Sequence, residues 1–379
     1  MRTHFPRTIF VAATAAVVLA GCAAPTSAPT SQPTDAAPSP TATADVLVGL
    51  SLEQKVGQLF MVGTVADKAD KQTLALVADP GVGSIFLSGR SSRGVEATAE
   101  IVNQFVDQAS GPLFVATDQE GGEVQVLSGD GFDLIPSALE QGQQDPGELE
   151  AAASDWGSQL SDAGVNLNLG PVADVISGPD STNQPIAALD RAFGYDAGAV
   201  DTHAGAVVSG LESAGVTATI KHFPGLGYVE GNTDNESGVT DTVTGPEGPT
   251  VQSFAALING GAKSVMVSSA IYAKIDDSAP AVFSSAVVTD LLRDSLGFDG
   301  LILTDDLSGA TQVQAWTPAE RAILSIDAGV DIVLVTRTPS LAPEMMDAVV
   351  AKATDDPAFA AKVDTAARRV LEQKAALGL

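Results

Sequence analysis

A lysine and a histidine stand side by side at the end of an apolar stretch of the chain. Residues 216–220 are mostly β-branched or apolar, which is typical of a buried strand, and Lys221 and His222 follow them directly. A proline and two glycines come next, and they favour an irregular turn over a helix. Because polar groups at the carboxyl ends of buried parallel strands often form a site, we expect both side chains to contact a ligand.

A second apolar stretch, Leu301–Leu303, leads into Thr304 and the acidic pair Asp305 and Asp306. The composition of the chain makes such carboxylates the reactive groups to consider. With 3 histidines and 1 cysteine, the chain cannot build a histidine-rich metal site or a zinc–thiolate site. It also contains neither a Gly-x-Ser-x-Gly motif nor a Walker-type phosphate loop. Hydrolytic chemistry in this chain must therefore rest mainly on carboxylates.

Eight short apolar runs, each followed by a helical stretch such as Pro318–Ala328, must position these groups. The runs are Gln58–Val62, Val82–Leu87, Leu113–Thr117, Val165–Leu169, Val216–Ile220, Ser264–Val267, Leu301–Leu303 and Asp331–Val335. Strand alternating with helix predicts a parallel sheet with right-handed crossovers. Eight such units predict an α/β fold closed into a (β/α)8 TIM-type barrel. A doubly wound open sheet is the alternative, but residues 63–66 lack the Gly-rich loop that usually follows its first strand.

Polar side chains follow most of these runs. After the third run and onward they are Asp118 and Glu120, Asp174, Lys221 and His222, Ser268 and Ser269, Asp305 and Asp306, and Thr336 and Arg337. In a barrel all these strand ends meet on one face. Carboxylates, cations and hydroxyls would then surround one cleft, which suits a polyhydroxylated substrate because each hydroxyl needs a donor or an acceptor.

The first residues are typical of a secretory signal. Arg2 and Arg7 give the positive end, and the apolar run Ile9–Leu19 is too short to span a bilayer comfortably. The segment ends at Leu19–Cys22, which resembles the lipobox of bacterial lipoproteins and implies cleavage before Cys22 and lipidation of that residue. Because Cys22 is the only cysteine, an intrachain disulfide is excluded.

We therefore expect three parts: a signal peptide over residues 1–21, the lipidated Cys22 with a disordered tether over 22–45, and a barrel domain over 46–379. The tether is rich in Ala, Pro, Ser and Thr, a composition typical of extended linkers. The net charge of −28 excludes nucleic acid as a partner, since that affinity comes from Lys and Arg on phosphates. The expected location is extracytoplasmic, with the lipid anchored in the cell membrane, and we expect a monomer.

Six motifs of the body resemble those of glycoside hydrolase family 3, in particular its single-domain β-N-acetylglucosaminidases. They are Leu52–Phe60, Asp118–Gly122, Val165–Val175, Asp190–Gly194, Lys221–Gly225 and Leu301–Ser308. The resemblance covers residues 52–379 and implies a single catalytic barrel without a C-terminal sandwich domain. It also implies a carbohydrate substrate and no metal or organic cofactor.

The resemblance assigns roles to individual residues. Asp118, Arg191, Lys221 and His222 match positions that bind the sugar, and Asp305 matches the nucleophile. Retaining cleavage of a glycosidic bond needs such a carboxylate to attack the anomeric carbon and an acid to protonate the leaving oxygen. Asp306 lies on the other side of the strand, where it could simply cap the strand end.

The chain departs from the family pattern where the acid is expected. The family carries Asp-Ser-His on the loop after the fifth strand, with the histidine as acid/base, and the matching residues here are Asn232, Thr233 and Asp234. Asp234 therefore takes the acid/base position by spacing, and Glu236 is the second candidate. Glu123 and Val126 also replace two arginines of the family's sugar-binding loop.

Three functions are compatible with this sequence. The first is a retaining exo-β-N-acetylglucosaminidase that removes terminal β-linked N-acetylglucosamine from cell-wall or chitin-derived fragments. The second is another exo-β-glycosidase, such as a β-glucosidase, because a pocket for an N-acetyl group leaves no mark in the sequence. The third is a non-catalytic glycan-binding lipoprotein, which the missing histidine and cations would fit.

Overall fold

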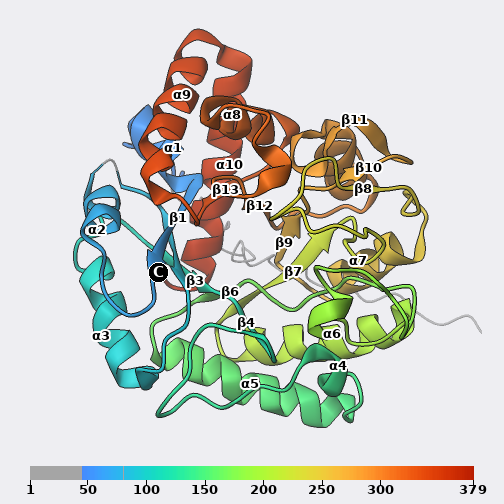
Figure 1. The fold of residues 1–379 in the computed structure, drawn as a ribbon. Helices are drawn as coiled ribbons and strands as arrows, with labels where there is room; N and C mark the ends of the chain where they lie inside the picture. The colour runs from blue at the N-terminus through green and yellow to red at the C-terminus, as the bar shows by residue number, and fades with distance from the viewer. Residues whose placement is uncertain (1–44, 80) are drawn as a thin grey trace, which may run out of the picture. The chain divides into compact units, whose positions relative to one another are not determined.

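The computed structural model describes residues 45–79 and 81–379, and the centre of this part is a closed barrel of parallel strands (Figure 1). In order around the barrel the strands are β1 (Phe60–Val65), β2 (Ser84–Ser88), β3 (Phe114–Thr117), β6 (Leu167–Asn168), β7 (Thr217–Phe223), β9 (Ser264–Val267), β12 (Leu301–Asp306) and β13 (Ile332–Val335). β13 pairs with β1 and closes the ring. The predicted (β/α)8 architecture is confirmed. The predicted signal peptide, Cys22 and nearly all of the tether lie outside the described residues.

Helices surround the barrel and connect successive strands (Figure 1). They are α1 (Leu52–Gln58), α2 (Lys71–Ala78), α3 (Gly94–Val106), α4 (Ala138–Gln141), α5 (Pro146–Asp162), α6 (Ala197–Ser213), α7 (Pro249–Asn259), η3 (Ala286–Ser295), α8 (Pro318–Ala328), α9 (Ala342–Asp355) and α10 (Pro357–Ala376). Capping side chains fix where several of them begin. Ser51 forms a capping box with Gln54 at α1, and Thr317 forms one with Glu320 at α8. In the described part of the chain, no helix is both long and apolar enough to cross a membrane.

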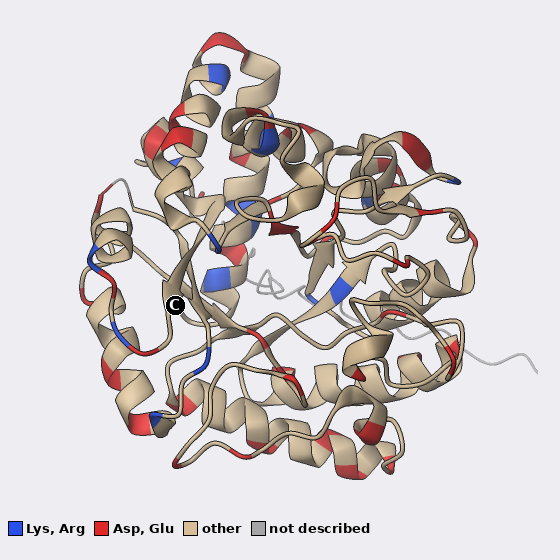
Figure 2. Ribbon diagram, in the orientation of Figure 1, with Lys and Arg blue, Asp and Glu red and all other residues tan. Residues whose placement is uncertain are grey.

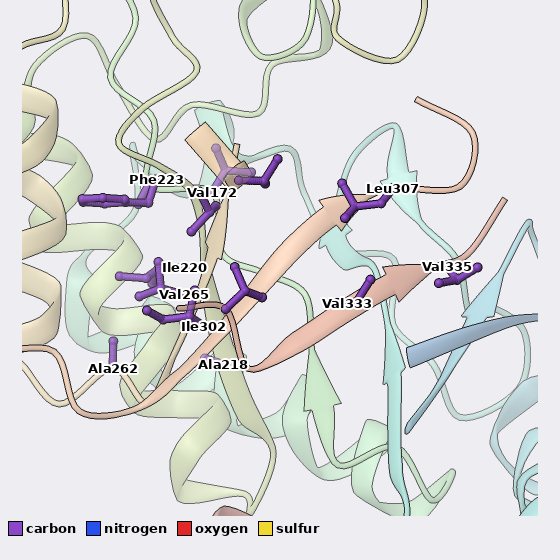
Figure 3. Close-up of a cluster of buried hydrophobic side chains, with 14 of the residues drawn as sticks. Val172, Ala218, Ile220, Phe223, Ala262, Val265, Ile302, Leu307, Val333 and Val335 are labelled. Atoms are coloured by element: carbon purple, nitrogen blue, oxygen red, sulfur yellow. The ribbon is translucent and has the colours of Figure 1, made fainter. Parts of the chain in front are cut away.

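Alternation along the strands divides the core into two layers. Apolar side chains that fill the barrel interior include Met61, Phe86, Phe114, Leu167, Leu169, Met266, Leu301, Leu303, Ile332 and Leu334. The residues between them face the helices, and Figure 3 shows part of this outer layer, with Ile220, Val265, Ile302 and Val333. Since successive side chains of a strand point to opposite faces, Asp305 shares the inward face of β12 with Leu301 and Leu303.

Several predicted boundaries were wrong by a few residues, including those of the first and fifth predicted strands. Gln58 ends α1 instead of starting the first strand, because the helix that begins at the Ser51 capping box continues through this residue. Lys221 and His222 lie within β7, which continues to Phe223. The turn begins only at the following proline, and Gly225 supplies a φ of 133° that other residues rarely adopt.

A small three-stranded sheet ties together two loops at the carboxyl end of the barrel. It consists of β8 (Thr240–Asp241), β10 (Ile271–Tyr272) and β11 (Asp276–Pro280). β8 belongs to the loop after β7, and β10 and β11 belong to the loop after β9. The loop that carries Asp234 is therefore held at its far end by hydrogen-bonded pairing with a neighbouring loop.

Candidate active site

A cavity of about 500 Å³ opens at the carboxyl ends of the barrel strands. Its polar lining includes Asp118, Arg191, Lys221, His222, Asn232, Asp234, Asp305 and Arg337. Its apolar lining includes Phe86, Leu169, Leu226, Met266 and Leu334. The six side chains predicted for catalysis and sugar binding are thus brought together around one space. The seventh predicted residue, Cys22, lies outside the described part of the chain.

Lys221 stands at the centre of a buried ionic network. Its Nζ lies 2.8 Å from Asp118 Oδ1 and 2.6 Å from Glu120 Oε1. Glu120 also accepts two parallel hydrogen bonds of 2.8 Å from Arg191, a bidentate geometry that fixes both side chains. Asp118 keeps 29% of its side chain exposed, whereas Glu120 keeps 5%. Asp118 therefore remains available to accept hydrogen bonds from a ligand, and Glu120 serves the two cations.

Mutual attraction keeps this network charged despite its burial. Burial opposes ionisation of Glu120, but Arg191 and Lys221 outweigh it and lower the pKa of Glu120 to about 2. Burial likewise opposes the charged form of Lys221, yet Asp118 and Glu120 raise its pKa above the ordinary value. Lys221 is therefore a fixed cation and a hydrogen-bond donor, and it has no capacity to transfer protons near neutral pH.

His222 is oriented by Asp174, which follows β6. The Nδ1 atom of His222 lies 2.7 Å from Asp174 Oδ2, and Asp174 Oδ1 accepts hydrogen bonds from the backbone N–H groups of His222 and Leu226. Asp174 is fully buried, so its carboxylate is dedicated to this turn of the chain. The ring nitrogen left available to a ligand is Nε2.

Strict alternation would allow only one of two consecutive residues to face the cavity, yet both Lys221 and His222 line it. The pairing of β7 with β9 is irregular at this point, since its register shifts between Lys221 and Phe223. Such irregularities occur beside active sites, where they redirect a side chain. The residue types of this segment do not indicate the irregularity.

The two aspartates at the end of β12 have different surroundings. Asp306 is buried and accepts hydrogen bonds from the side chains of Ser308 and Thr336 and from the backbone of Gly309. Asp305 is partly exposed to the cavity, and one of its oxygens accepts the backbone N–H of Asp306 at 2.7 Å. Asp306 thus fastens the end of β12 to the segment after β13, whereas Asp305 keeps part of its carboxylate exposed to the cavity.

Asp234 reaches the cavity from the loop after β7. Its carbonyl oxygen accepts two hydrogen bonds from Thr311, and its backbone N–H donates to Asn232 Oδ1 at 2.9 Å. Gln312 adds a second clamp, because its side chain both accepts from and donates to the backbone of Val239. These contacts fix the Asp234 loop against the segment that follows the Asp305 strand.

The pKa of Asp234 is raised to about 6. Burial is the main cause, and the negative charge of Asp305 adds to it, whereas Arg337 acts in the opposite direction. A carboxyl group with this pKa holds a proton in weakly acidic solution and can release it near neutral pH, which are the properties of a general acid. Asp305 and Asp234 both line the cavity, and glycosidic cleavage uses two carboxyl groups, one as nucleophile and one as acid.

Glu236, the second candidate for the acid, is exposed and does not line the cavity. Its backbone N–H donates to Asn232 O and its side chain accepts weakly from Asn232 N, so the side chain folds back on its own loop. Glu123, which replaces one of the family's arginines, is also exposed and outside the cavity lining. Elsewhere too, Asp and Glu are spread over the outer helices and loops (Figure 2).

Three functional contacts of this site were not predicted from the sequence. They are the pairing of Glu120 with both Arg191 and Lys221, the support of His222 by Asp174, and the ion pair between Asp234 and Arg337. Glu120, Asp174 and Arg337 each follow a strand, but the sequence alone assigns no role to any of them. Their position after a barrel strand was the available signal, and it does not say which side chains meet.

A family model described as the glycosyl hydrolase family 3 N terminal domain matches residues 51–373. The chain belongs to glycoside hydrolase family 3. Among the curated members of this family, Beta-hexosaminidase LpqI of Mycobacterium tuberculosis is 33% identical over 366 residues, which cover 90% of each chain. The Beta-hexosaminidase of Nitrosospira multiformis is 34% identical over 296 residues, 76% of this chain and 82% of that protein.

Solved structures place the fold in the same family. The Beta-N-acetylhexosaminidase of Beutenbergia cavernae superposes with a TM-score of 0.85 at 56% identity, over 87% of this chain and 99% of the other. A family 3 β-N-acetylglucosaminidase from a Paenibacillus strain superposes with a TM-score of 0.80 at 28% identity, over 87% of this chain and 64% of the other. The resemblance inferred from six sequence motifs is confirmed.

Proposed function

We propose that the protein is a retaining exo-β-N-acetylglucosaminidase that hydrolyses terminal β-linked N-acetylglucosamine. The observation that carries this proposal is that two aspartates, Asp305 and Asp234, line one cavity whose other polar residues can bind hydroxyl groups. The choice of sugar rests on the relatives, which are named β-hexosaminidase or β-N-acetylglucosaminidase. The natural source we propose is a cell-wall or chitin-derived fragment.

The proposed reaction proceeds in two steps. In the first, Asp305 attacks the anomeric carbon while Asp234 protonates the departing oxygen, which leaves a glycosyl ester on Asp305 and a carboxylate at Asp234. In the second, Asp234 removes a proton from water, which attacks the same carbon and releases Asp305. Because the anomeric carbon is inverted twice, the product keeps the β configuration.

The remaining polar residues bind and orient the sugar in this scheme. Asp118 accepts hydrogen bonds from hydroxyl groups, and Arg191, Lys221 and the Nε2 atom of His222 are placed around the same sugar. Leu169, Met266 and Leu334 belong to the interior of the barrel and also line the cavity. A cavity that ends on the filled barrel interior admits a chain end better than the middle of a polymer, which supports exo action.

A panel of aryl β-glycosides distinguishes this proposal from a different exo-β-glycosidase. We expect the aryl β-N-acetylglucosaminide to be hydrolysed with a kcat/KM at least about 100-fold above that of the matching β-glucoside, since loss of a built contact typically costs that much. Release of nitrophenol from each substrate at equal concentration measures the ratio. A preference for the glucoside would overturn the choice of sugar, and binding without any turnover would indicate a glycan-binding protein instead.

The N-terminal segment supports a second proposal, that the enzyme is held at the outer face of the cell membrane by a lipid on Cys22. One acyl chain gives only marginal anchoring, whereas the several chains of a lipoprotein cysteine anchor stably. Cys22→Ser should therefore move the protein from the membrane fraction to the medium while its activity on aryl glycosides stays unchanged. Fractionation followed by immunoblotting gives the answer, and a variant that stays with the membrane would show that the anchor lies elsewhere.

A further inference from the structure

Arg337, which follows β13, forms an ion pair with Asp234 across the cavity rim. Its Nη2 atom lies 2.7 Å from Asp234 Oδ2, and both side chains remain partly exposed, 47% for the arginine and 34% for the aspartate. Both residues also line the cavity. The contact joins the loop after β7, which carries Asp234, to the segment after β13.

The position of Arg337 is prepared by the strand that carries Asp305. The backbone N–H of Arg337 donates to Ser308 Oγ at 3.1 Å and to Asp306 Oδ1 at 3.3 Å. Its aliphatic stem lies over Gly309, where a Cβ atom would come within 2.6 Å of Arg337 Cβ. The backbone of Arg337 is therefore held by the residues that directly follow Asp305. A side chain at residue 309 would displace the stem of Arg337.

The charged groups around Asp234 make this cation significant. Asp305 and Asp306 face it from β12 and add negative charge, whereas His222 on β7 and Arg337 after β13 act in the opposite direction. Arg337 is the only one of these groups that forms an ion pair with Asp234 among the described residues. Asn232, the other neighbour, bonds the backbone N–H of Asp234 and leaves its carboxyl group free for Arg337.

We propose that Arg337 is a positioning residue for Asp234, holding its carboxyl group at the cavity wall and stabilising the carboxylate that remains after proton donation. The inference rests on the acid/base role of Asp234 in the proposed function. Its chemical logic follows from the type of acid. A histidine acid carries a positive charge before it donates its proton, and a carboxylate partner stabilises that charged form. An aspartic acid carries a negative charge after it donates its proton, and a cation stabilises that form.

The pH dependence of kcat/KM tests this role, because a purely structural contact would not move it. Arg337→Gln removes the cation and should move the basic limb of the profile upward by about one pH unit, the low end of the effect of an opposite charge nearby. Arg337→Lys keeps a positive charge, so its basic limb should lie close to that of the wild-type enzyme. Arg368→Gln is the matched control, since Arg368 on α10 forms a similarly exposed 2.6 Å ion pair with Asp45, and neither residue lines the cavity.

An unmoved limb in Arg337→Gln, or an equal shift in Arg337→Lys, would overturn the proposal. A shift in Arg368→Gln would also overturn it, because the effect would then follow from net charge alone. Thermal unfolding of each variant shows that the comparison is made between folded proteins.

Combining Arg337→Gln with Asp234→Asn separates an action through Asp234 from direct contact with the substrate. On an alkyl glycoside, whose leaving group needs the proton of Asp234, Arg337→Gln should change kcat/KM in the wild-type background and have no effect on the residual kcat/KM in the Asp234→Asn background. An effect of equal size in both backgrounds would mean that Arg337 binds substrate directly, which contradicts the proposal. The single variant Asp234→Asn reports on the proposed function itself. Full activity on alkyl glycosides in that variant would refute the acid role of Asp234, whatever Arg337 does.

Discussion

Replacing Asp305 with alanine should reduce turnover by at least about three orders of magnitude, because the covalent step then has no nucleophile. The fold should persist, since Asp305 accepts only the backbone N–H of its neighbour and is partly exposed. A slowly released fluorosugar that keeps the N-acetyl group on C2, with the fluorine at C5, should label the wild-type enzyme at Asp305, and mass spectrometry of the digested protein would locate the label. Asp305→Asn serves as the conservative control for shape.

Replacing the neighbouring Asp306 with alanine should have a different effect from replacing Asp305. Asp306 is buried and accepts hydrogen bonds from Ser308, Gly309 and Thr336, so Asp306→Ala leaves several buried donors without an acceptor. We expect that variant to lose thermal stability as well as activity, whereas Asp305→Ala loses activity alone. Labelling at Asp306, or substantial turnover by Asp305→Ala, would refute the assignment of the nucleophile.

Replacing Asp234 with alanine should slow the hydrolysis of alkyl glycosides by about 10²–10⁴-fold, the usual contribution of a positioned acid. Activated aryl glycosides should lose far less in the first step, since their leaving groups depart without a proton. Added azide should then restore turnover and yield a β-glycosyl azide, because a small anion can enter the space of the missing carboxylate and needs no base. Product analysis by NMR identifies the azide and its configuration.

The same residue should set the basic limb of the wild-type pH profile. The pKa of Asp234 is about 6, so the group is protonated and able to donate below that pH and loses its proton above it. For substrates with poor leaving groups, kcat/KM should therefore fall about tenfold per pH unit well above pH 6. In Asp234→Ala this limb should disappear. Glu236→Ala is the control, and azide rescue in that variant instead of in Asp234→Ala would assign the role to Glu236.

The sequence by itself determined the barrel architecture and which residues lie around the cavity. Apolar runs such as Ser264–Val267, alternating with helical stretches such as Pro318–Ala328, are local signals, and both became elements at those residues. Parallel strands in a barrel bring their carboxyl ends to one face, so residues after the runs had to share a site. Alternation along β12 also predicts that Asp305 shares the face of Leu301 and Leu303, which favours it over Asp306 as the residue that faces the barrel interior.

Only the tertiary structure decided which of these side chains meet. Lys221 and Asp118 are 103 positions apart in the chain, and their contact at 2.8 Å depends on how the residue after β3 meets a residue within β7 across the barrel. The same is true of Glu120 with Arg191 and of Asp234 with Arg337. Loop conformation follows from many weak contacts, such as those of Gln312 with Val239, and none of these has a sequence period.

The choice between Asp234 and Glu236 shows the physical reason most clearly. Both acids lie on one short loop, and their residue types alone do not distinguish them. Hydrogen bonds from Thr311 fix the backbone of Asp234, which turns its side chain to the cavity, whereas the side chain of Glu236 folds back toward Asn232. Burial and neighbouring charges then give Asp234 its raised pKa. Such a property depends on surroundings in space, and the order of residues along the chain does not contain it.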